Sequence, residues 1–111
     1  MIPVDHKPEP SRAVREIVRL IAPLGLPPNS LRLVHAGEDA PHIDLGPGRK
    51  PAGVECLPGP VTPAILQAAN DADLIAMVTA GSHGFLDALR GSTTEQVIRQ
   101  SHCPVLALPG T

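Results

Sequence analysis

The stretch "MVTAGSHGFLDALRGSTTEQVIRQSHCPVLALPG", residues 77–110, carries the clearest structural signals in the chain. An apolar strand runs into a glycine-rich turn, and Gly91-Ser92 follows at the expected start of a helix. Ser92 and Glu95 have the S-x-x-E spacing of a capping box, which satisfies free backbone N–H groups at a helix start. The apolar residues at 104–109, "PVLALP", predict a closing strand with prolines at its ends. A helix start behind a glycine turn is also a position that favours anions.

The rest of the chain alternates short apolar strands with amphipathic helices. Ser11 and Thr62 are the predicted N-caps of the first two helices, with Pro63 at the first helical position of the second. Residues 37–52 hold three prolines and three glycines without a helical period, which predicts a loop. We expect strands at 1–5, 30–36, 53–57, 73–79 and 104–109, and helices at 11–22, at 59–70 and after Ser92. The sequence therefore predicts a single α/β domain, residues 1–111, with an open five-stranded parallel sheet and flanking helices.

The composition argues against several classes of protein. The chain of 111 residues is 42% hydrophobic but has one Phe and no Trp or Tyr, so its core is aliphatic and base stacking is not expected. Nine Lys and Arg against eleven Asp and Glu leave a net charge of −2, which argues against nucleic acid and membrane surfaces as partners. No apolar run approaches a membrane span and no signal peptide is expected, so we predict a cytoplasmic protein. Cys56 and Cys103 are expected to be buried free thiols, with a redox-sensing pair as the alternative.

Five segments, in order, resemble the universal stress protein family. The family's nucleotide signature is G-x-x-G, nine residues, then G-[S/T], and here nine residues separate Gly81 from Gly91-Ser92. "PVDHKPEPSRAV" resembles the family's opening strand and first helix, and "LRLVHA" its second strand. "GPVTPAILQAANDADLIAM" and "SHCPVLALP" resemble its later helix, fourth strand and closing segment. The resemblance implies an adenine-nucleotide alpha-hydrolase-like, Rossmann-like fold.

The sequence departs from the family pattern in two places. Val78 stands where the family usually has Gly, and a β-branched side chain there hinders close approach of the backbone to a ligand. Residues 37–52 replace a region where the family usually has another helix, so that the helix between strands two and three is reduced to a loop. We expect the sheet there to be covered by another subunit or by the loop's own Ile43 and Leu45. The short first strand fits either a trimmed domain or half of a tandem pair.

The resemblance implies an adenine nucleotide, ATP or AMP with Mg²⁺, at the carboxyl ends of the strands. Asp5, Ala36 and Met77 would surround the adenine, and the turn and the following helix start would hold the phosphates. Ala80, beside Gly81, supplies no charge to those phosphates. The expected nucleotide-binding residues are Asp5, Ala36, Met77, Val78, Ala80, Gly81, Gly91, Ser92, Thr93 and Thr94. For Asp5 the alternative is a role in turn hydrogen bonds, and for Ser92 it is helix capping alone.

Three functional hypotheses follow. The first is a small stress-response module that binds an adenine nucleotide weakly and forms a homodimer through its C-terminal strand, as family members often do. The second is a dimerisation or interaction module that keeps the fold without binding nucleotide, which Val78 and Ala80 favour. The third is an enzyme that hydrolyses a bound nucleotide slowly. The sequence shows no nucleophile with a base and no metal-ligand spacing, so no catalytic or metal residue is assigned.

Overall fold

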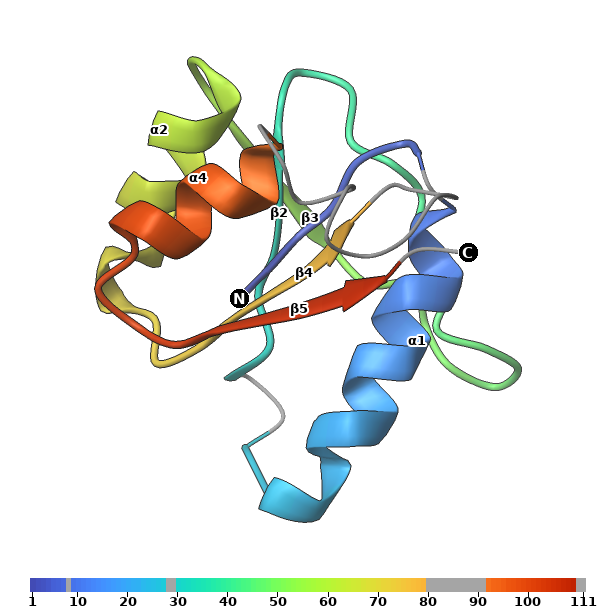
Figure 1. The fold of residues 1–111 in the computed structure, drawn as a ribbon. Helices are drawn as coiled ribbons and strands as arrows, with labels where there is room; N and C mark the ends of the chain where they lie inside the picture. Colours follow the sequence, from blue (N-terminus) through green and yellow to red (C-terminus); the bar gives the residue numbers. More distant parts are fainter. Residues whose placement is uncertain (8, 28–29, 80–91, 110–111) are drawn as a thin grey trace.

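The computed structural model describes residues 1–7, 9–27, 30–79 and 92–109. Parallel strands lie at the centre, with α1 (Pro10–Ile21) on one side and α2 (Val61–Ala68) and α4 (Thr93–Gln100) on the other (Figure 1). The strands are β1 (Ile2–Pro3), β2 (Leu33–Ala36), β3 (Val54–Leu57), β4 (Ile75–Thr79) and β5 (Val105–Pro109). Short 3₁₀ turns follow the first two helices, η1 (Ala22–Leu24) and η3 (Ala69–Asp71). The expected α/β class is thus confirmed, with three α-helices in the described part of the chain.

The strands form two small sheets, so the expectation of a single five-stranded sheet was wrong. β1, β2 and β3 form one parallel sheet, and β4 and β5 form another. The amide of Ala76 donates to the carbonyl of Met1 at 3.0 Å, so β1 does lie beside β4. In a parallel ladder the next bond would be donated by residue 3, and Pro3 has no N–H group. Because β1 is two residues long, this proline is enough to end the pairing.

Two aliphatic clusters fill the space on either side of the strands. Neighbouring residues of a strand point to opposite faces, and β4 accordingly sends Ala76 to one cluster and Ile75 and Met77 to the other. The α1-side cluster contains Ile2, Val14, Ile17, Leu33, Ile43 and Ala76, and the cluster under α2 and α4 contains Ile65, Ala69, Ile75, Met77 and Val97. Each large aliphatic side chain that is fully buried contributes about 1.5–3 kcal/mol. The aliphatic core expected from the composition is therefore present.

The predicted loop, residues 37–52, contains no helix and continues to residue 53. Ile43 is 1% exposed and belongs to the α1-side cluster, against which Leu45 also packs. The loop thus covers the sheet with its own side chains, the second of the two expected solutions. The hydroxyl of Ser11 ties it to α1, donating to the carbonyl of His42 at 3.3 Å and accepting from the amide of Asp44 at 2.8 Å.

The helix starts of α1 and α2 differ from the predicted caps. Glu9 is the N-cap of α1, and its carboxylate accepts from the Ser11 amide at 3.0 Å. The prediction of Ser11 was wrong because Pro10 begins the helix and the Ser11 hydroxyl is used by the loop. α2 begins at Val61, after Pro60, so Thr62 is no cap and Pro63 is its third residue. A proline fits there because amides of the first turn have no acceptor within the helix.

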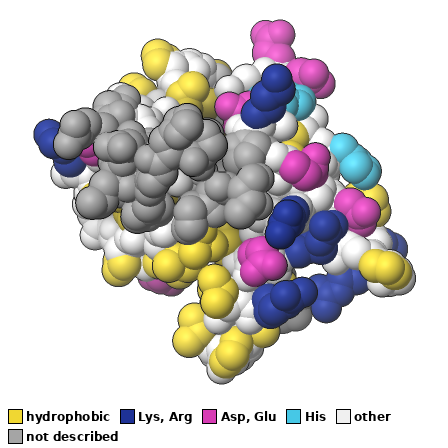
Figure 2. Space-filling model, turned by 45° about the vertical axis from the view of Figure 1, so that its right-hand side comes forward, with side chains coloured by type: hydrophobic (Ala, Val, Ile, Leu, Met, Phe, Trp, Pro, Cys, Tyr) yellow, Lys and Arg dark blue, Asp and Glu magenta, His cyan; other side chains and the backbone are white. Residues whose placement is uncertain are grey.

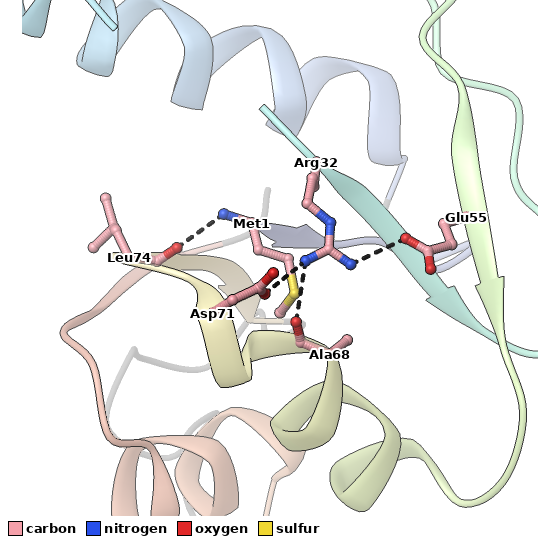
Figure 3. Close-up of polar contacts among 6 residues, drawn as sticks. All are labelled: Met1, Arg32, Glu55, Ala68, Asp71 and Leu74. Atoms are coloured by element: carbon pink, nitrogen blue, oxygen red, sulfur yellow. Dashed lines mark hydrogen bonds and ion pairs between the residues drawn. The ribbon is translucent and has the colours of Figure 1, made fainter. Parts of the chain in front are cut away.

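At the amino ends of the strands, Arg32 connects the two sheets (Figure 3). Its guanidinium lies 3.1 Å from the Glu55 carboxylate on β3 and 3.1 Å from the Asp71 carboxylate, just before β4. It also donates to the carbonyl of Ala68, at the end of α2, at 3.1 Å. A positive charge is favourable at this end of a helix.

The amino group of Met1 lies close to this connection and donates to the carbonyl of Leu74 at 2.8 Å (Figure 3). Burial of this group, together with the nearby Arg32 guanidinium, lowers its pKa below the ordinary value. Folding therefore disfavours the protonated form of this amino group, and keeping it charged lowers the stability of the folded chain.

The surface carries side chains of both charges, as expected from a net charge near zero. Figure 2 shows basic and acidic side chains interspersed on the face it displays, and hydrophobic side chains gathered at the free end of α1, where Leu20, Leu24 and Leu26 are exposed. Both cysteines are free, but Cys56 is exposed and Cys103 half-buried, so the expectation of two buried thiols was wrong. In the described part of the chain, no helix has the length and apolar character required to cross a bilayer.

Candidate functional site

A cleft of about 240 Å³ lies at the carboxyl ends of β1, β2 and β4. The first residues of α1, α2 and α4 complete its described walls. Seven of the ten predicted nucleotide-binding residues line it: Asp5, Ala36, Met77, Val78, Ser92, Thr93 and Thr94. The other three, Ala80, Gly81 and Gly91, lie outside the described residues. Residues that are up to 89 positions apart in the sequence thus meet where ligands of open α/β sheets bind.

The floor of the cleft is apolar and continuous with the core. Val34 is fully buried and Met77 is 5% exposed, and Ile2 and Ile65 reach the cleft from the clusters on opposite sides of the strands. Pockets for small molecules are usually lined in this way, with a few polar groups that fix orientation. The floor suits a flat, weakly polar ring.

Val78 forms part of the wall and is half-buried. It packs against the α1-side cluster, to which Ala76 of the same strand face also belongs. The side chain that replaces the family's usual Gly is therefore part of the protein's packing as well as of the cleft. Because valine is larger than glycine, the Val78 side chain reduces the space in the cleft that is open to a ligand.

Asp5 is exposed at the rim of the cleft. One of its carboxylate oxygens, Oδ1, accepts from the amide of His6 at 2.7 Å, which is the turn hydrogen bond expected as an alternative role. Within the described residues no second hydrogen bond to this carboxylate is formed. Its other oxygen can accept from a hydroxyl or amino group of a ligand.

The start of α4 offers hydrogen-bond donors to the same cleft. Ser92 is the N-cap, and its hydroxyl accepts from the Glu95 amide at 3.0 Å, which confirms this half of the predicted capping box. The amides of Thr93 and Thr94 belong to the first turn and have no acceptor within the helix. Since the positive end of the helix dipole lies at the same place, this wall favours an anionic group.

His35 lines the cleft and was not among the predicted residues. It is 8% exposed, and its Nδ1–H donates to the carbonyl of Val4 at 2.9 Å, joining β2 to the end of β1. The ring of His6 meets it edge to face at a centroid distance of 5.3 Å, and His6 Nε2–H donates to the carbonyl of Asp39 at 2.7 Å. A side chain on Gly37 would place its Cβ 2.8 Å from His35 Nε2.

Lys7 also lines the cleft and was not among the predicted residues. It lies in the loop after β1, two residues beyond Asp5, and its side chain is exposed. The rule that placed Asp5 at the carboxyl end of a strand applies equally to the residues that follow it. The position of Lys7 in the sequence, just beyond the end of a predicted strand, could therefore have predicted that it lines the cleft.

Comparison with known proteins agrees with this architecture. Residues 44–109 match the profile of the universal stress protein family. None of the curated proteins compared with the chain matches it. The matched segment includes β3, α2, β4, α4 and β5, which is more than half of the chain. By this match the chain belongs to the universal stress protein family.

Proposed function

We propose that this stress-response domain binds an adenine nucleotide weakly in the cleft, and that binding is coupled to homodimerisation through β5. The observation that carries the proposal is that one cleft gathers residues from β1, β2, β4 and the start of α4. The adenine would lie on the apolar floor between Asp5, Ala36 and Met77. The phosphates would point toward Ser92, Thr93 and Thr94.

The charges of the cleft support ATP or AMP with Mg²⁺. Among the described lining residues, Lys7 is the one Lys or Arg, and Asp5 is the one carboxylate. Their charges cancel, so the described walls bring no net positive charge to a triphosphate. Mg²⁺ binds phosphate oxygens readily and would offset that charge.

The size of the cleft supports weak binding. Its volume of about 240 Å³ is below the roughly 300–1,000 Å³ of most ligand pockets. Val78 reduces that space. The Val78→Gly variant should therefore bind Mg-ATP several-fold more tightly, while it loses about 1–3 kcal/mol of stability from lost packing and added chain entropy. Unchanged affinity would contradict this explanation of weak binding.

The first test is calorimetric titration with Mg-ATP and with AMP, accompanied by thermal melts at several ligand concentrations. A ligand at 100 times its Kd stabilises the protein by about 2.7 kcal/mol, which a melt detects. Asp5→Asn should weaken binding, because a carboxylate oxygen at the rim is replaced. Asp73→Asn is the matched control, since this exposed carboxylate lies before β4 at the other end of the strands. No saturable binding at millimolar nucleotide would refute the proposal.

A second candidate is an interaction module that binds no nucleotide. The observation that favours it is β5, which pairs with β4 alone among the described strands and keeps Val105, Leu106 and Leu108 half-buried. A strand edge with apolar side chains is a natural pairing surface. Sedimentation equilibrium with and without Mg-ATP separates the two candidates. A nucleotide-independent dimer supports the interaction module, a dimer strengthened by nucleotide supports the first proposal, and a monomer in both conditions refutes self-association.

A further inference from the structure

We infer that His6 and His35 form a clamp between the loops that follow β1 and β2, and that this clamp holds Asp5 in one place at the rim of the cleft. The inference rests on the proposed nucleotide site, in which Asp5 meets the ligand. His35 lines the cleft, whereas His6 does not. Neither ring needs to touch the ligand, so both histidines are positioning residues that act through Asp5.

The chain after β1 depends on side chains for its placement. The amide of Val4 donates to the carbonyl of Val34 at 2.8 Å, which continues the contact between β1 and β2. Among the described residues, the backbones of Asp5, His6 and Lys7 make no hydrogen bond to other backbone groups. Segments with few such bonds open easily. A carboxylate in this segment therefore has a fixed place only if side chains supply the attachment.

The two histidine rings supply that attachment. His35 Nδ1–H donates to the Val4 carbonyl at 2.9 Å, so the residue before Asp5 is held at both its amide and its carbonyl. His6 Nε2–H donates to the carbonyl of Asp39, in the loop after β2, at 2.7 Å. The His6 amide in turn donates to Asp5 Oδ1 at 2.7 Å. Asp5 thus lies between two residues that are each tied to β2 or to the loop after it.

The rings also support each other. They meet edge to face with their centroids 5.3 Å apart, within the range of favourable aromatic pairs. Gly37 adjoins the ring of His35, and a Cβ at that position would lie 2.8 Å from Nε2. The absence of a side chain there leaves the space that the ring occupies. Because His35 is only 8% exposed, its ring has little room to turn away from the Val4 carbonyl.

A carboxylate that is already in place binds a ligand better than a mobile one, because less conformational freedom is lost on binding. Loss of the clamp should therefore weaken binding only by the part that Asp5 contributes. No His6 variant should weaken binding more than Asp5→Asn does, and none should weaken it further once Asp5 is replaced. A histidine that acted independently of Asp5 would weaken binding in both backgrounds.

Calorimetric titration with AMP measures this coupling for His6→Phe, Asp5→Asn and the double variant. Phenylalanine keeps a ring against His35 but cannot donate to the Asp39 carbonyl. We expect His6→Phe to raise the Kd about two- to tenfold, the effect of one hydrogen bond, and to leave the Kd unchanged in the Asp5→Asn background. His6→Gln, which keeps a side-chain N–H donor, should restore most of the affinity. His102→Phe is the control, because His102 is exposed and does not line the cleft.

Nuclear magnetic resonance tests the clamp in the ligand-free protein. The nitrogen chemical shifts of the neutral His35 ring should show the Nδ1–H tautomer, since the hydrogen bond to Val4 fixes which nitrogen carries the proton. His35→Asn places an amide N–H near the position of Nδ1, whereas His35→Gln places one near the position of Nε2. The amide hydrogen of Val4 should therefore exchange faster in His35→Gln than in His35→Asn.

An Nε2–H tautomer at His35 would overturn the inference, because Nδ1 could then not donate to the Val4 carbonyl. An unchanged Kd in His6→Phe would overturn it as well, as would equal weakening of AMP binding with and without the Asp5 carboxylate. If the wild type binds no AMP, the proposed nucleotide site fails. The His35 tautomer and the exchange at Val4 need no ligand, so they decide in that case whether the clamp exists.

Discussion

Replacing Arg32 by Met removes the side-chain contacts by which Arg32 links the two sheets and keeps the apolar stem of the side chain. Three contacts are lost, to the carboxylates of Glu55 and Asp71 and to the carbonyl of Ala68. Partly exposed ion pairs contribute about 0.2–1 kcal/mol each, and a positive charge at a helix C-terminus about 0.3–1 kcal/mol. Arg32→Met should therefore lower the free energy of unfolding by about 1–2 kcal/mol.

Urea denaturation followed by circular dichroism measures this loss, and Arg19→Met is its control. Arg19 also faces a carboxylate, that of Glu16 at 3.7 Å, but its side chain is 78% exposed against 38% for Arg32. The control should change stability by less than about 0.5 kcal/mol. Raising the salt from 0.1 M to 1 M reduces the Debye length from about 10 Å to about 3 Å and should reduce the loss in Arg32→Met.

Hydrogen exchange locates the effect. The amide of Ala76 donates to the Met1 carbonyl across the junction of the sheets, so it should exchange faster in Arg32→Met than in Arg19→Met. If the two variants have equal stability and equal exchange at Ala76, the reasoning that Arg32 joins the sheets is refuted.

Three further predictions concern the packing around the cleft and the first residue. Gly37→Ala should lower the free energy of unfolding by about 1–3 kcal/mol, because φ at Gly37 is +152° and the new Cβ would meet the His35 ring. Gly48→Ala is the control: φ there is +76° and the new Cβ has no neighbour within 4 Å, so only backbone strain is added. Equal losses of stability in thermal melts of the two variants would contradict the predicted clash with His35. Ser11→Ala should cost about 1–2 kcal/mol in urea denaturation, because two hydrogen bonds to the loop are lost. In a chain beginning at Met1, the lowered pKa of the amino group means that the unfolded state holds more protons between this pKa and about 8. Stability should rise with pH through that window, and N-terminal acetylation should abolish the rise; an acetylated chain with the same pH profile would exclude Met1 as its source.

The fold class was predictable because its signals are periodic and repeated along the chain. Apolar runs such as 73–79 predict buried strands whatever surrounds them, and the S-x-x-E spacing placed the start of α4 correctly. The continuity of the sheet depends instead on one residue. Pro3 is unremarkable in the sequence, but it falls at the register position where the ladder needs a donor, and register is known only once the strands are placed.

The predicted caps and site residues show the same limit. Ser11 and Thr62 are good N-cap residues, yet their neighbours Pro10 and Pro60 set where the helices begin. For the cleft, the family pattern predicts residues that the family shares and cannot predict those particular to this chain. Lys7 does not belong to the family pattern, and only its position just beyond the carboxyl end of β1 could have predicted that it lines the cleft.

The cleft and Arg32 lie at opposite ends of the same strands, and each spans the junction of the two sheets. At the amino ends, Arg32 joins the sheets through its side chain, beside the hydrogen bonds of Met1 to Leu74 and Ala76. At the carboxyl ends, the cleft is lined from both sheets: Asp5 follows β1 and Ala36 ends β2 in the first sheet, whereas Met77 lies on β4 in the second. A ligand that contacted residues of both sheets would therefore join the two sheets. Such a ligand stabilises the folded chain by RT ln(1 + [L]/Kd), at a place that shares no contact with Arg32. Its stabilisation should therefore add to that of Arg32, and Arg32→Met should lose the same free energy with and without ligand.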